Sequence, residues 1–181
     1  MATAQFGRVI TAMITPFTED GAVDYESAVA LAKHLVAHGS EGLLVGGTTG
    51  EGATMTAEEK LKLYTLIVDA VGKRGEGKKV PVMGNIGTIS TADTIAFGNK
   101  AKETGIDCAL VIVPFYVKPN QEGMYQHFTA VAKGVDLPLV LYNVPGRTGV
   151  SSQPETIKRI VDECPNVVGI KDATGSWDQV T

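Results

Sequence analysis

Cysteine is scarce in this sequence, and long apolar runs are absent from it. The 181 residues include two cysteines, Cys108 and Cys164, which are far apart and lie in apolar or strand-like surroundings. This arrangement argues against a disulfide or a cysteine metal site and favours two reduced packing residues. No run approaches the ~18 apolar residues that a membrane span needs. The formal net charge of −4 argues against nucleic acid or an anionic membrane as the partner.

The N-terminal segment also lacks the features of a secretory signal. It reads MATAQFGRVITAMITPF, with one early arginine and neither a compact apolar core nor a small-residue cleavage site. We therefore expect a cytoplasmic protein. Hydrophobic residues make up 44% of the chain and charged residues 20%, which is the composition of a globular protein, and the length suffices for one domain with a sizeable core.

Short runs rich in valine, isoleucine and leucine recur along the whole chain. They are continuous and do not alternate with polar residues, which predicts strands buried on both faces, as in a parallel sheet. The runs begin at Val9, Gly42, Val80, Cys108, Leu137 and Val167. Helical patterns separate them, and the first, over residues 24–39, ends at Gly39, as expected of a glycine that follows a helix. The repeat of about thirty residues is the size of a βαβ unit.

Two four-residue segments have the spacing of a helix capping box. Thr56–Glu59 predicts the start of a helix that runs towards Val71. Ser152–Glu155 has the same spacing and carries Pro154 in the first turn, where its missing N–H costs little.

The alternation of strand and helix fits either an open doubly wound sheet or a closed (β/α)₈ barrel. A dinucleotide-binding open sheet usually carries G-x-G-x-x-G after its first strand, whereas here the first run continues into TPFTEDG. A barrel places its chemistry at the C-terminal ends of several strands, which is where this sequence has its unusual residues. We therefore predict an α/β protein, a single (β/α)₈ TIM-barrel domain over residues 1–181. Six strand candidates predict a barrel truncated after the sixth strand, without the last two βα units.

Two of the predicted strands end in residues that suit the binding of a carboxylate. GGTTGE contains Thr48 and Thr49, whose amides and hydroxyls could hold one. A phosphate loop is excluded because Glu51 follows where lysine is required, and a plain glycine-rich turn is the alternative. In YNVPGRTG, the phenol of Tyr142 can transfer protons and Arg147 can clamp a carboxylate bidentately. The alternative is a core tyrosine with a surface arginine.

A lysine, Lys171, ends the last apolar run in VVGIKDATG. At the mouth of an apolar barrel its ammonium group would be partly desolvated, which lowers its pKa. A lysine with a neutral fraction attacks carbonyl groups and forms a Schiff base. The alternative is a lysine that snorkels to solvent and pairs with Asp172, although adjacent strand residues point to opposite faces.

Two further motifs favour simple explanations. Tyr116, between the prolines of PFYVKP, is a rigid exposed aromatic for which packing or an interface contact suffices. His34 and His38 have the i, i+4 spacing of a metal pair, but Leu35 stands where a zinc protease has its glutamate. We favour a solvated helix face there and predict no metal site.

The three motifs GGTTGE, YNVPGRTG and GIKDATG, in this order and at these spacings, resemble the dihydrodipicolinate synthase family. This family comprises class I aldolases and lyases that act through a pyruvate Schiff base on a (β/α)₈ barrel. The resemblance extends over nearly the whole chain. It implies that Lys171 is the Schiff-base lysine and that no cofactor is needed beyond the covalent pyruvate imine. It also implies that Tyr142 is the proton donor and acceptor.

Further roles follow from the same resemblance. Thr48 would link Tyr142 to Tyr116 in a proton relay, with Tyr116 reaching in from a neighbouring subunit of a homotetramer built as a dimer of dimers. Thr49 would bind the pyruvate carboxylate, and Arg147 the carboxylate of the aldehyde substrate. Two departures stand out: the family's PYYN reads PFYV here, and the family's C-terminal helical region is absent.

The paired threonines and the loop arginine distinguish branches of this family. Sialic acid lyases and sugar-acid aldolases typically lack both, and both are present here. The resemblance therefore implies condensation of pyruvate with aspartate-4-semialdehyde to 4-hydroxy-tetrahydrodipicolinate, on the route to diaminopimelate and lysine. Two alternatives remain: another pyruvate aldolase of the family, similar to N-acetylneuraminate lyase or a sugar-acid aldolase, and a non-catalytic relative that only binds ligand.

Overall fold

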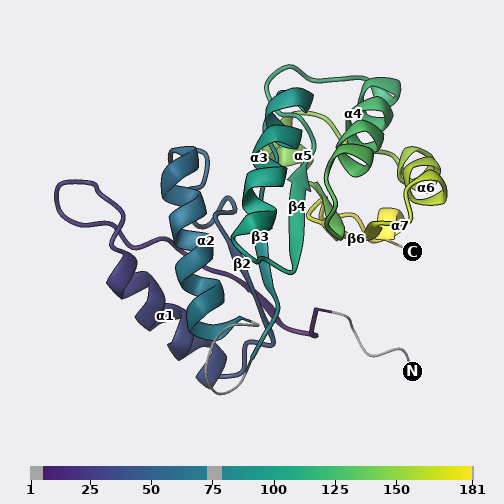
Figure 1. Cartoon of the computed structure of the whole chain (residues 1–181). Coiled ribbons are helices and arrows are strands. Elements are labelled where there is room, and N and C mark those ends of the chain that lie inside the picture. Colours follow the sequence, from purple (N-terminus) through teal and green to yellow (C-terminus); the bar gives the residue numbers. More distant parts are fainter. Residues whose placement is uncertain (1–5, 73–78, 181) are drawn as a thin grey trace. The chain divides into compact units, whose positions relative to one another are not determined.

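Strands and helices alternate along the computed structural model, which describes residues 6–72 and 79–180 (Figure 1). The six strands are β1 (Ile10–Ala12), β2 (Gly42–Val45), β3 (Val82–Asn85), β4 (Cys108–Ile112), β5 (Leu139–Asn143) and β6 (Val167–Asp172). The helices are α1 (Tyr25–Ala37), α2 (Ala57–Val71), α3 (Thr91–Glu103), α4 (Gln121–Gly134), α5 (Pro145–Thr148), α6 (Pro154–Glu163) and α7 (Trp177–Val180). All six predicted strands and the helices between them are confirmed, and α5 and α7 are two additional short helices.

The residues group into two compact units. One contains the residues up to Asn85 together with Lys100–Cys108, and the other contains Ile86–Asn99 together with the residues from Ala109 onward. In the first unit, β1, β2 and β3 follow one another in parallel. In the second unit, β4, β5 and β6 do the same. Parallel strands joined through helices define the predicted α/β class.

The core of the first unit forms where α1 and α2 lie side by side and α2 packs on β3 (Figure 1). Leu63 and Ile67 of α2 and Leu43 of β2 are fully buried. The predicted capping box of α2 is confirmed: the Thr56 hydroxyl accepts a hydrogen bond from the Glu59 N–H, and the Glu59 carboxylate accepts one from the Thr56 N–H. It satisfies amides that the first turn of a helix leaves without partners.

The start and the end of α1 also follow from local chemistry. The Asp24 side chain caps the helix by accepting a hydrogen bond from the Ser27 N–H. Gly39 has a φ of 106° directly after the C-cap residue, as predicted for a glycine at this place. The buried face of the helix consists of its small residues, Ala28 and Ala32, and of Val36.

The core of the second unit forms around β5, all of whose residues are buried. Met124, Phe128 and Val131 of α4 are fully buried, as is Ile160 of α6. Helices α4 and α6 lie side by side (Figure 1). Both cysteines are buried with free thiols, which confirms them as packing residues.

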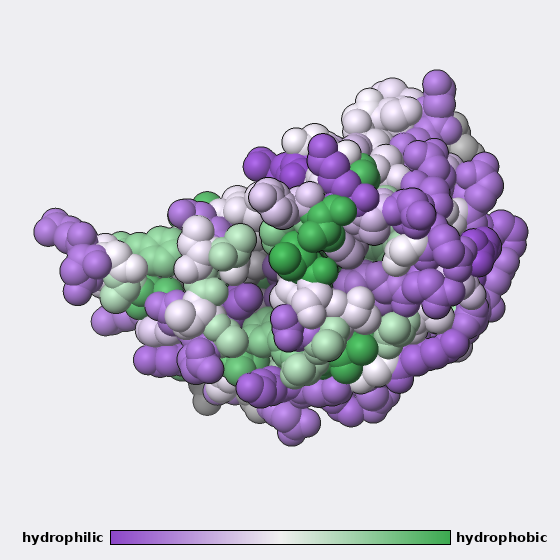
Figure 2. All heavy atoms as spheres, turned by 90° about the horizontal axis from the view of Figure 1, so that it is seen from above, coloured by the Kyte–Doolittle hydropathy of each residue, from purple (hydrophilic) through white to green (hydrophobic). Residues whose placement is uncertain are grey.

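The outer strands β1 and β6 differ from the prediction of burial on both faces. Val9, Ile10, Val168 and Ile170 are 40–55% exposed. The reason is that β1 and β6 stand at the two ends of the strand order, so each has one strand neighbour among the described residues. Apolar side chains do reach the surface in Figure 2, where they lie among polar ones. An apolar run therefore predicts a strand but does not predict how many neighbours cover it.

The pairing of β5 with β6 contains one irregularity. Leu139 pairs with Val167, but the next residue of β5, Val140, pairs with Gly169, so Val168 has no partner on β5. From there the register is regular and brings Tyr142 opposite Lys171. Such an extra residue is the mark of a β-bulge.

Candidate functional site

The structure brings Lys171 and Tyr142 together at the carboxyl ends of β6 and β5. The two residues are register partners on adjacent parallel strands. The Nζ of Lys171 lies 4.3 Å from the centroid of the Tyr142 ring, a distance at which an ammonium group interacts with an aromatic ring. Tyr142 is buried and Lys171 is half-buried. The strand ends thus form a compact lysine–tyrosine pair.

Burial lowers the pKa of Lys171 below its ordinary value of 10.5. The cause is desolvation, which disfavours the charged ammonium form. The neutral amine is therefore more abundant at a given pH than it is for a lysine in water. The predicted direction is confirmed, although Lys171 lies on an outer strand.

The carboxylate of Asp172 is engaged elsewhere. Its Oδ1 accepts a hydrogen bond from the Thr174 N–H at 3.0 Å and another from the Thr174 hydroxyl at 2.6 Å. These bonds close a local turn directly after β6. The carboxylate that follows Lys171 in sequence thus stabilises the loop, which argues against the alternative of a Lys171–Asp172 ion pair.

Arg147 lies in α5, the single turn of helix that follows β5. Its side chain is exposed. The turn begins with Pro145 and ends at Gly149, whose φ of 74° suits glycine. Thr148 is buried, and its hydroxyl lies 2.7 Å from the carbonyl oxygen of Val150, to which it donates. Arg147 therefore projects from a segment whose backbone is fixed by its own hydrogen bonds.

Asn143 anchors the far end of this segment, a role that the sequence did not predict. Its side chain is buried, and its Oδ1 accepts a hydrogen bond from the Ser152 N–H at 3.0 Å. Its Nδ2 donates to the Ser152 carbonyl oxygen at 3.1 Å and to the Ser151 hydroxyl at 3.2 Å. The sequence feature that could have revealed this role is the amide residue directly after Tyr142 in YNVPGRTG.

The hydrogen bonds from Asn143 to Ser152 also correct the predicted capping box at Ser152–Glu155. The N-cap of α6 is Gln153, which has no side-chain cap, and Pro154 does open the helix.

Tyr116 points away from the protein, with 87% of its surface exposed. Its φ of 66° and the φ of 46° at Lys118 are unusual for residues other than glycine. The segment therefore holds an aromatic side chain out in solvent through a strained backbone, in keeping with the rigid exposed aromatic that the sequence predicts. Among the described interactions, none joins Tyr116 to Lys171.

Thr48 and Thr49 belong to the first unit, and both are exposed. They lie in a tight turn whose glycines are required, because a Cβ atom on Gly52 would lie 1.9 Å from the carbonyl oxygen of Gly46. The buried hydroxyl of Thr15 donates to the carbonyl oxygen of Gly50 at 2.7 Å and holds the turn in place. The glycine-rich turn is thus confirmed, and its use as a carboxylate site stays a prediction.

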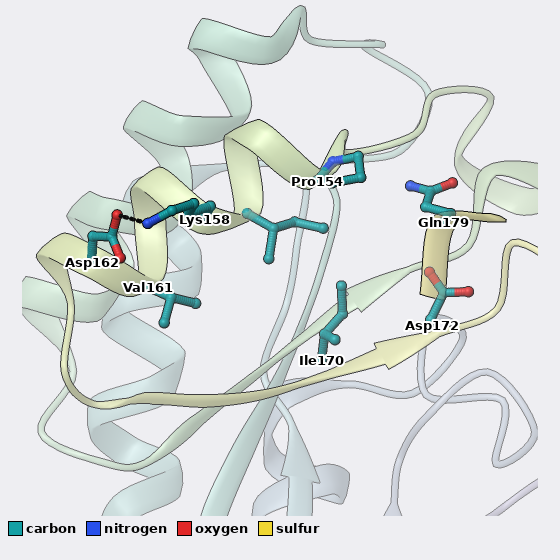
Figure 3. A pocket seen from close by; sticks show the side chains of 8 residues that line it. Pro154, Lys158, Val161, Asp162, Ile170, Asp172 and Gln179 are labelled. Carbon is teal, nitrogen blue, oxygen red and sulfur yellow. Dashed lines mark hydrogen bonds and ion pairs between the residues drawn. The ribbon is translucent and has the colours of Figure 1, made fainter. Parts of the chain in front are cut away.

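A hollow of about 330 Å³ lies between α6 and β6 (Figure 3). Ile170 and Asp172 of β6 point into it, and Val161 and Lys158 of α6 lie along its other side. Side chains alternate between the two faces of a strand, so this hollow lies on the face of β6 opposite to Lys171. None of the six predicted site residues is among the residues that line it.

His34 and His38 stack on each other, with ring centroids 4.0 Å apart, on the exposed side of α1. The Nδ1 of His38 lies 2.7 Å from the carbonyl oxygen of His34. Within residues 6–72 and 79–180, no three histidine, cysteine, aspartate or glutamate side chains gather in a way that could hold a metal ion. In the same ranges, no helix has the length and apolar character required to cross a bilayer.

The fold and the site define a class of protein. The chain is an α/β protein of the TIM-barrel kind, with a lysine and a tyrosine side by side at the carboxyl ends of neighbouring parallel strands. Residues 5–181 match the model of the Dihydrodipicolinate synthetase family. The chain belongs to this family.

Individual relatives agree with this assignment. The chain is 54% identical over 167 residues to the 4-hydroxy-tetrahydrodipicolinate synthase of Symbiobacterium thermophilum, covering 92% of this chain and 55% of the relative. It is 51% identical over 177 residues to the enzyme of the same name from Heliobacterium modesticaldum, covering 98% of this chain and 57% of the relative. The chain thus spans little more than half the length of these curated relatives.

Solved structures share the fold. The structure of the Cyanidioschyzon merolae enzyme with lysine bound superimposes with a TM-score of 0.91 at 44% identity, over 96% of this chain and 58% of that one. A second dihydrodipicolinate synthase, from Bacillus anthracis, gives a TM-score of 0.91 at 43% identity, over 97% of this chain and 58% of that one. The predicted fold class and the predicted family are thereby confirmed.

Proposed function

We propose that the protein that carries this chain condenses pyruvate with L-aspartate-4-semialdehyde to 4-hydroxy-tetrahydrodipicolinate. The observation that carries the proposal is the pair formed by Lys171 and Tyr142. A half-buried lysine with a lowered pKa stands 4.3 Å from the ring of a buried tyrosine. This is the combination that Schiff-base chemistry needs, a nucleophilic amine beside a group that can transfer protons.

The proposed reaction begins at the Nζ of Lys171. The neutral amine attacks the ketone carbon of pyruvate, so that a nitrogen–carbon bond forms and the ketone oxygen receives a proton. That oxygen leaves as water, which gives a protonated imine. Because burial lowers the pKa of Lys171, a larger fraction of the amine is neutral than for a lysine in water. Tyr142 supplies and removes the protons through its phenol.

The second step forms the carbon–carbon bond. The positive imine nitrogen withdraws electrons, so the methyl group of the bound pyruvate loses a proton and becomes an enamine carbon. This carbon attacks the aldehyde carbon of the second substrate, whose oxygen takes up a proton. The imine nitrogen accepts electrons when the methyl proton leaves and returns them when the enamine carbon attacks. The amino group of the second substrate then attacks the imine carbon, closes the ring of the product and displaces the Nζ of Lys171 as the free amine. These steps need neither a metal nor an organic cofactor.

The remaining site residues keep the roles that the family resemblance implies. Thr49 binds the pyruvate carboxylate, and Arg147 binds the carboxylate of the aldehyde. Thr48 and Tyr116 extend the proton relay from Tyr142, with Tyr116 acting in a neighbouring subunit of a dimer of dimers. The cytoplasm is the proposed compartment. A sedimentation measurement tests the proposed tetramer. One solved relative is a monomeric dihydrodipicolinate synthase variant, so a monomer is the alternative outcome.

The names of the relatives favour this reaction over the other pyruvate aldolases of the family. Relatives at 51–54% identity are named 4-hydroxy-tetrahydrodipicolinate synthase. The paired threonines and Arg147 support the same choice. The aldehyde of this reaction has a carboxylate of its own in addition to that of pyruvate, and Arg147 supplies a cation that can bind it.

Trapping with borohydride tests the proposal. The protein is incubated with pyruvate, reduced, digested and analysed by mass spectrometry, and we expect one reduced pyruvate on Lys171. The variant Lys171→Met should give no adduct, whereas Lys158→Met should give the normal one. Lys158 is a suitable control because it is an exposed lysine of the same unit, paired with Asp162 at 2.6 Å. An adduct on another lysine, or none in an otherwise active protein, would disprove the mechanism.

A further inference from the structure

Gln121 is the first residue of α4 and touches the segment that leads away from Arg147. Its Nε2 donates a hydrogen bond to the carbonyl oxygen of Ser151 at 2.8 Å. Its Oε1 accepts one from the Gln153 N–H at 3.0 Å and another from the Thr156 hydroxyl at 2.7 Å. One side-chain amide therefore joins the start of α4 to the segment before α6 and to the first turn of α6.

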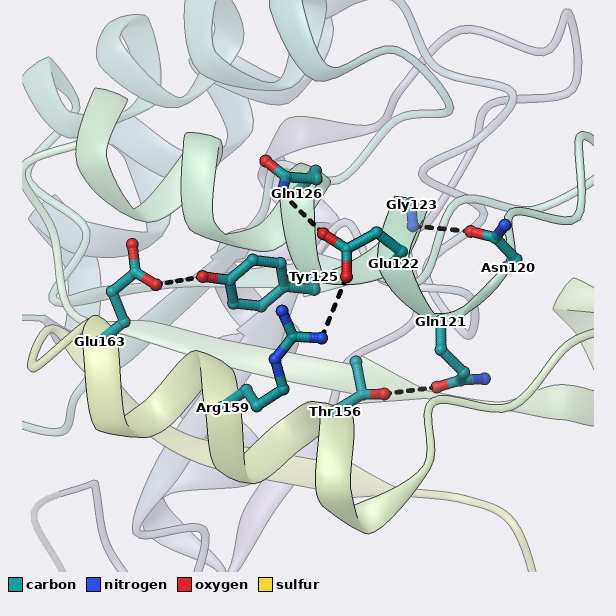
Figure 4. Close-up of polar contacts among 9 residues, drawn as sticks. All are labelled: Asn120, Gln121, Glu122, Gly123, Tyr125, Gln126, Thr156, Arg159 and Glu163. Carbon is teal, nitrogen blue, oxygen red and sulfur yellow. Dashed lines mark hydrogen bonds and ion pairs between the residues drawn. The ribbon is translucent and has the colours of Figure 1, made fainter.

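The position of Gln121 is itself fixed. Asn120 caps α4 by accepting a hydrogen bond from the Gly123 N–H at 2.8 Å. Further along the same pair of helices, Arg159 of α6 binds the Glu122 carboxylate at 3.0 Å and stacks on the ring of Tyr125. Figure 4 shows these contacts beside the bond from Thr156 to Gln121. Gln121 therefore contacts the segment from a helix whose start is held on several sides.

The segment between β5 and α6 is consequently held at its far end by three side-chain amides, one of which is Gln179 of α7, whose Nε2 donates to the Ser152 carbonyl oxygen at 2.9 Å. Asn143 holds Ser152 from the end of β5, and Gln121 holds Ser151 and Gln153 from α4. Arg147 lies within the segment, and its side chain is exposed. A long side chain in solvent depends on its backbone for direction. The turn that carries Arg147 is held by its own hydrogen bonds, and the amides hold the end of the segment to which this turn is joined.

We propose that Gln121 is a positioning residue for Arg147 and thereby determines binding of the aldehyde substrate. The inference rests on the proposed function, in which Arg147 binds the aldehyde carboxylate. Bidentate binding of a carboxylate by a guanidinium group has strict geometry, and small displacements of a binding group reduce the rate of reaction strongly. The hydrogen bonds of Gln121 go to Ser151, Gln153 and Thr156 and not to Lys171, so we expect pyruvate binding to be unchanged.

The test compares three variants with the unaltered protein. Gln121→Met keeps the length of the side chain and removes all three hydrogen bonds. Gln121→Glu keeps both bonds that the oxygen accepts and replaces the third with a repulsive contact between a carboxylate oxygen and the Ser151 carbonyl oxygen. Gln126→Met is the matched control, because Gln126 lies on the same helix and its Nε2 bonds to Glu122 at 2.8 Å, away from the segment.

We expect Gln121→Met to raise the KM for aspartate-4-semialdehyde roughly tenfold, which corresponds to about 1.4 kcal/mol. The KM for pyruvate and the borohydride-trapped adduct on Lys171 should stay unchanged. Gln121→Glu should also raise the KM for aspartate-4-semialdehyde, and Gln126→Met should not. A purely structural role would alter the two KM values together or lower thermal stability alone, and either result overturns the inference.

The outcomes separate this inference from the proposed function. If the unaltered protein forms no pyruvate adduct or does not condense the aldehyde, the proposed function fails, and the role of Gln121 fails with it. If the unaltered protein is active but Gln121→Met behaves like Gln126→Met, only the positioning role fails. Should Gln121→Met not fold, Gln121→Glu decides by the same comparison of the two KM values.

Discussion

Acid should destabilise this protein through one buried histidine, His127 on α4. The side chain is 5% exposed and lies edge-on to Phe128. Its Nδ1 lies 2.9 Å from the hydroxyl of Thr91 on α3, and its Nε2 is buried without a hydrogen-bond partner among the described residues. Burial lowers the pKa of His127 from 6.5 to about 4, because a charged imidazolium would lose its hydration there.

The sign of the pH dependence follows from this direction. The unfolded chain takes up the proton near pH 6.5, whereas folded His127 takes it up only near pH 4. Stability therefore falls as the pH is lowered through this window, because the unfolded state binds more protons. Each pKa unit is worth ~1.4 kcal/mol, so the loss between pH 7 and pH 4 should be about 3 kcal/mol.

Denaturant unfolding at several pH values between 7 and 4 measures this loss. His127→Asn replaces the ring with an amide that does not titrate and can keep the bond to Thr91. We expect its free energy of unfolding to fall by about 3 kcal/mol less than that of the unaltered protein over this range. His34→Asn, at an exposed position of α1, should behave like the unaltered protein. Parallel pH curves for His127→Asn and the unaltered protein would refute the reasoning.

Two further predictions concern a helix cap and the proton relay. Thr56→Ala removes one half of the capping box of α2 and should lower the free energy of unfolding by about 1 kcal/mol in thermal or denaturant melts; a change below the error of the measurement would contradict it. Tyr142→Phe and Thr48→Val should each lower kcat by roughly 10²-fold. If the two residues act as one relay, the kcat of the double variant should be little lower than that of the less active single variant. Losses in kcat that multiply fully in steady-state kinetics would show that the two residues act separately.

The sequence predicted the elements well because their signals are local. Each apolar run became a strand, and the Thr56–Glu59 spacing became a capping box. Lys171 and Tyr142 could be placed at strand ends for the same reason, since each directly follows the apolar residues of its run. Desolvation at such a place could be inferred without coordinates.

The features that the sequence did not predict depend on tertiary contacts. Ser152 has the spacing of a cap, but its N–H pairs with Asn143 and helix α6 begins at Pro154. The roles of Asn143 and Gln121 arise from hydrogen bonds that span residues far apart in the chain, which no periodicity records. Exposure of β1 and β6 likewise depends on the number of neighbouring strands and not on the residues of the strand itself.

Val168, which has no partner on β5, lies between the first residue of β6 and the end of the strand that carries Lys171. If the pairing of Leu139 with Val167 continued without interruption, Tyr142 would stand opposite Ile170, and Lys171 would stand opposite Asn143. A shift of one residue also exchanges the two faces of a strand, so the amine would leave the tyrosine for the opposite side. The bulge takes up this difference before Gly169. The bulge therefore sets the register in which the amine of Lys171 stands beside the ring of Tyr142.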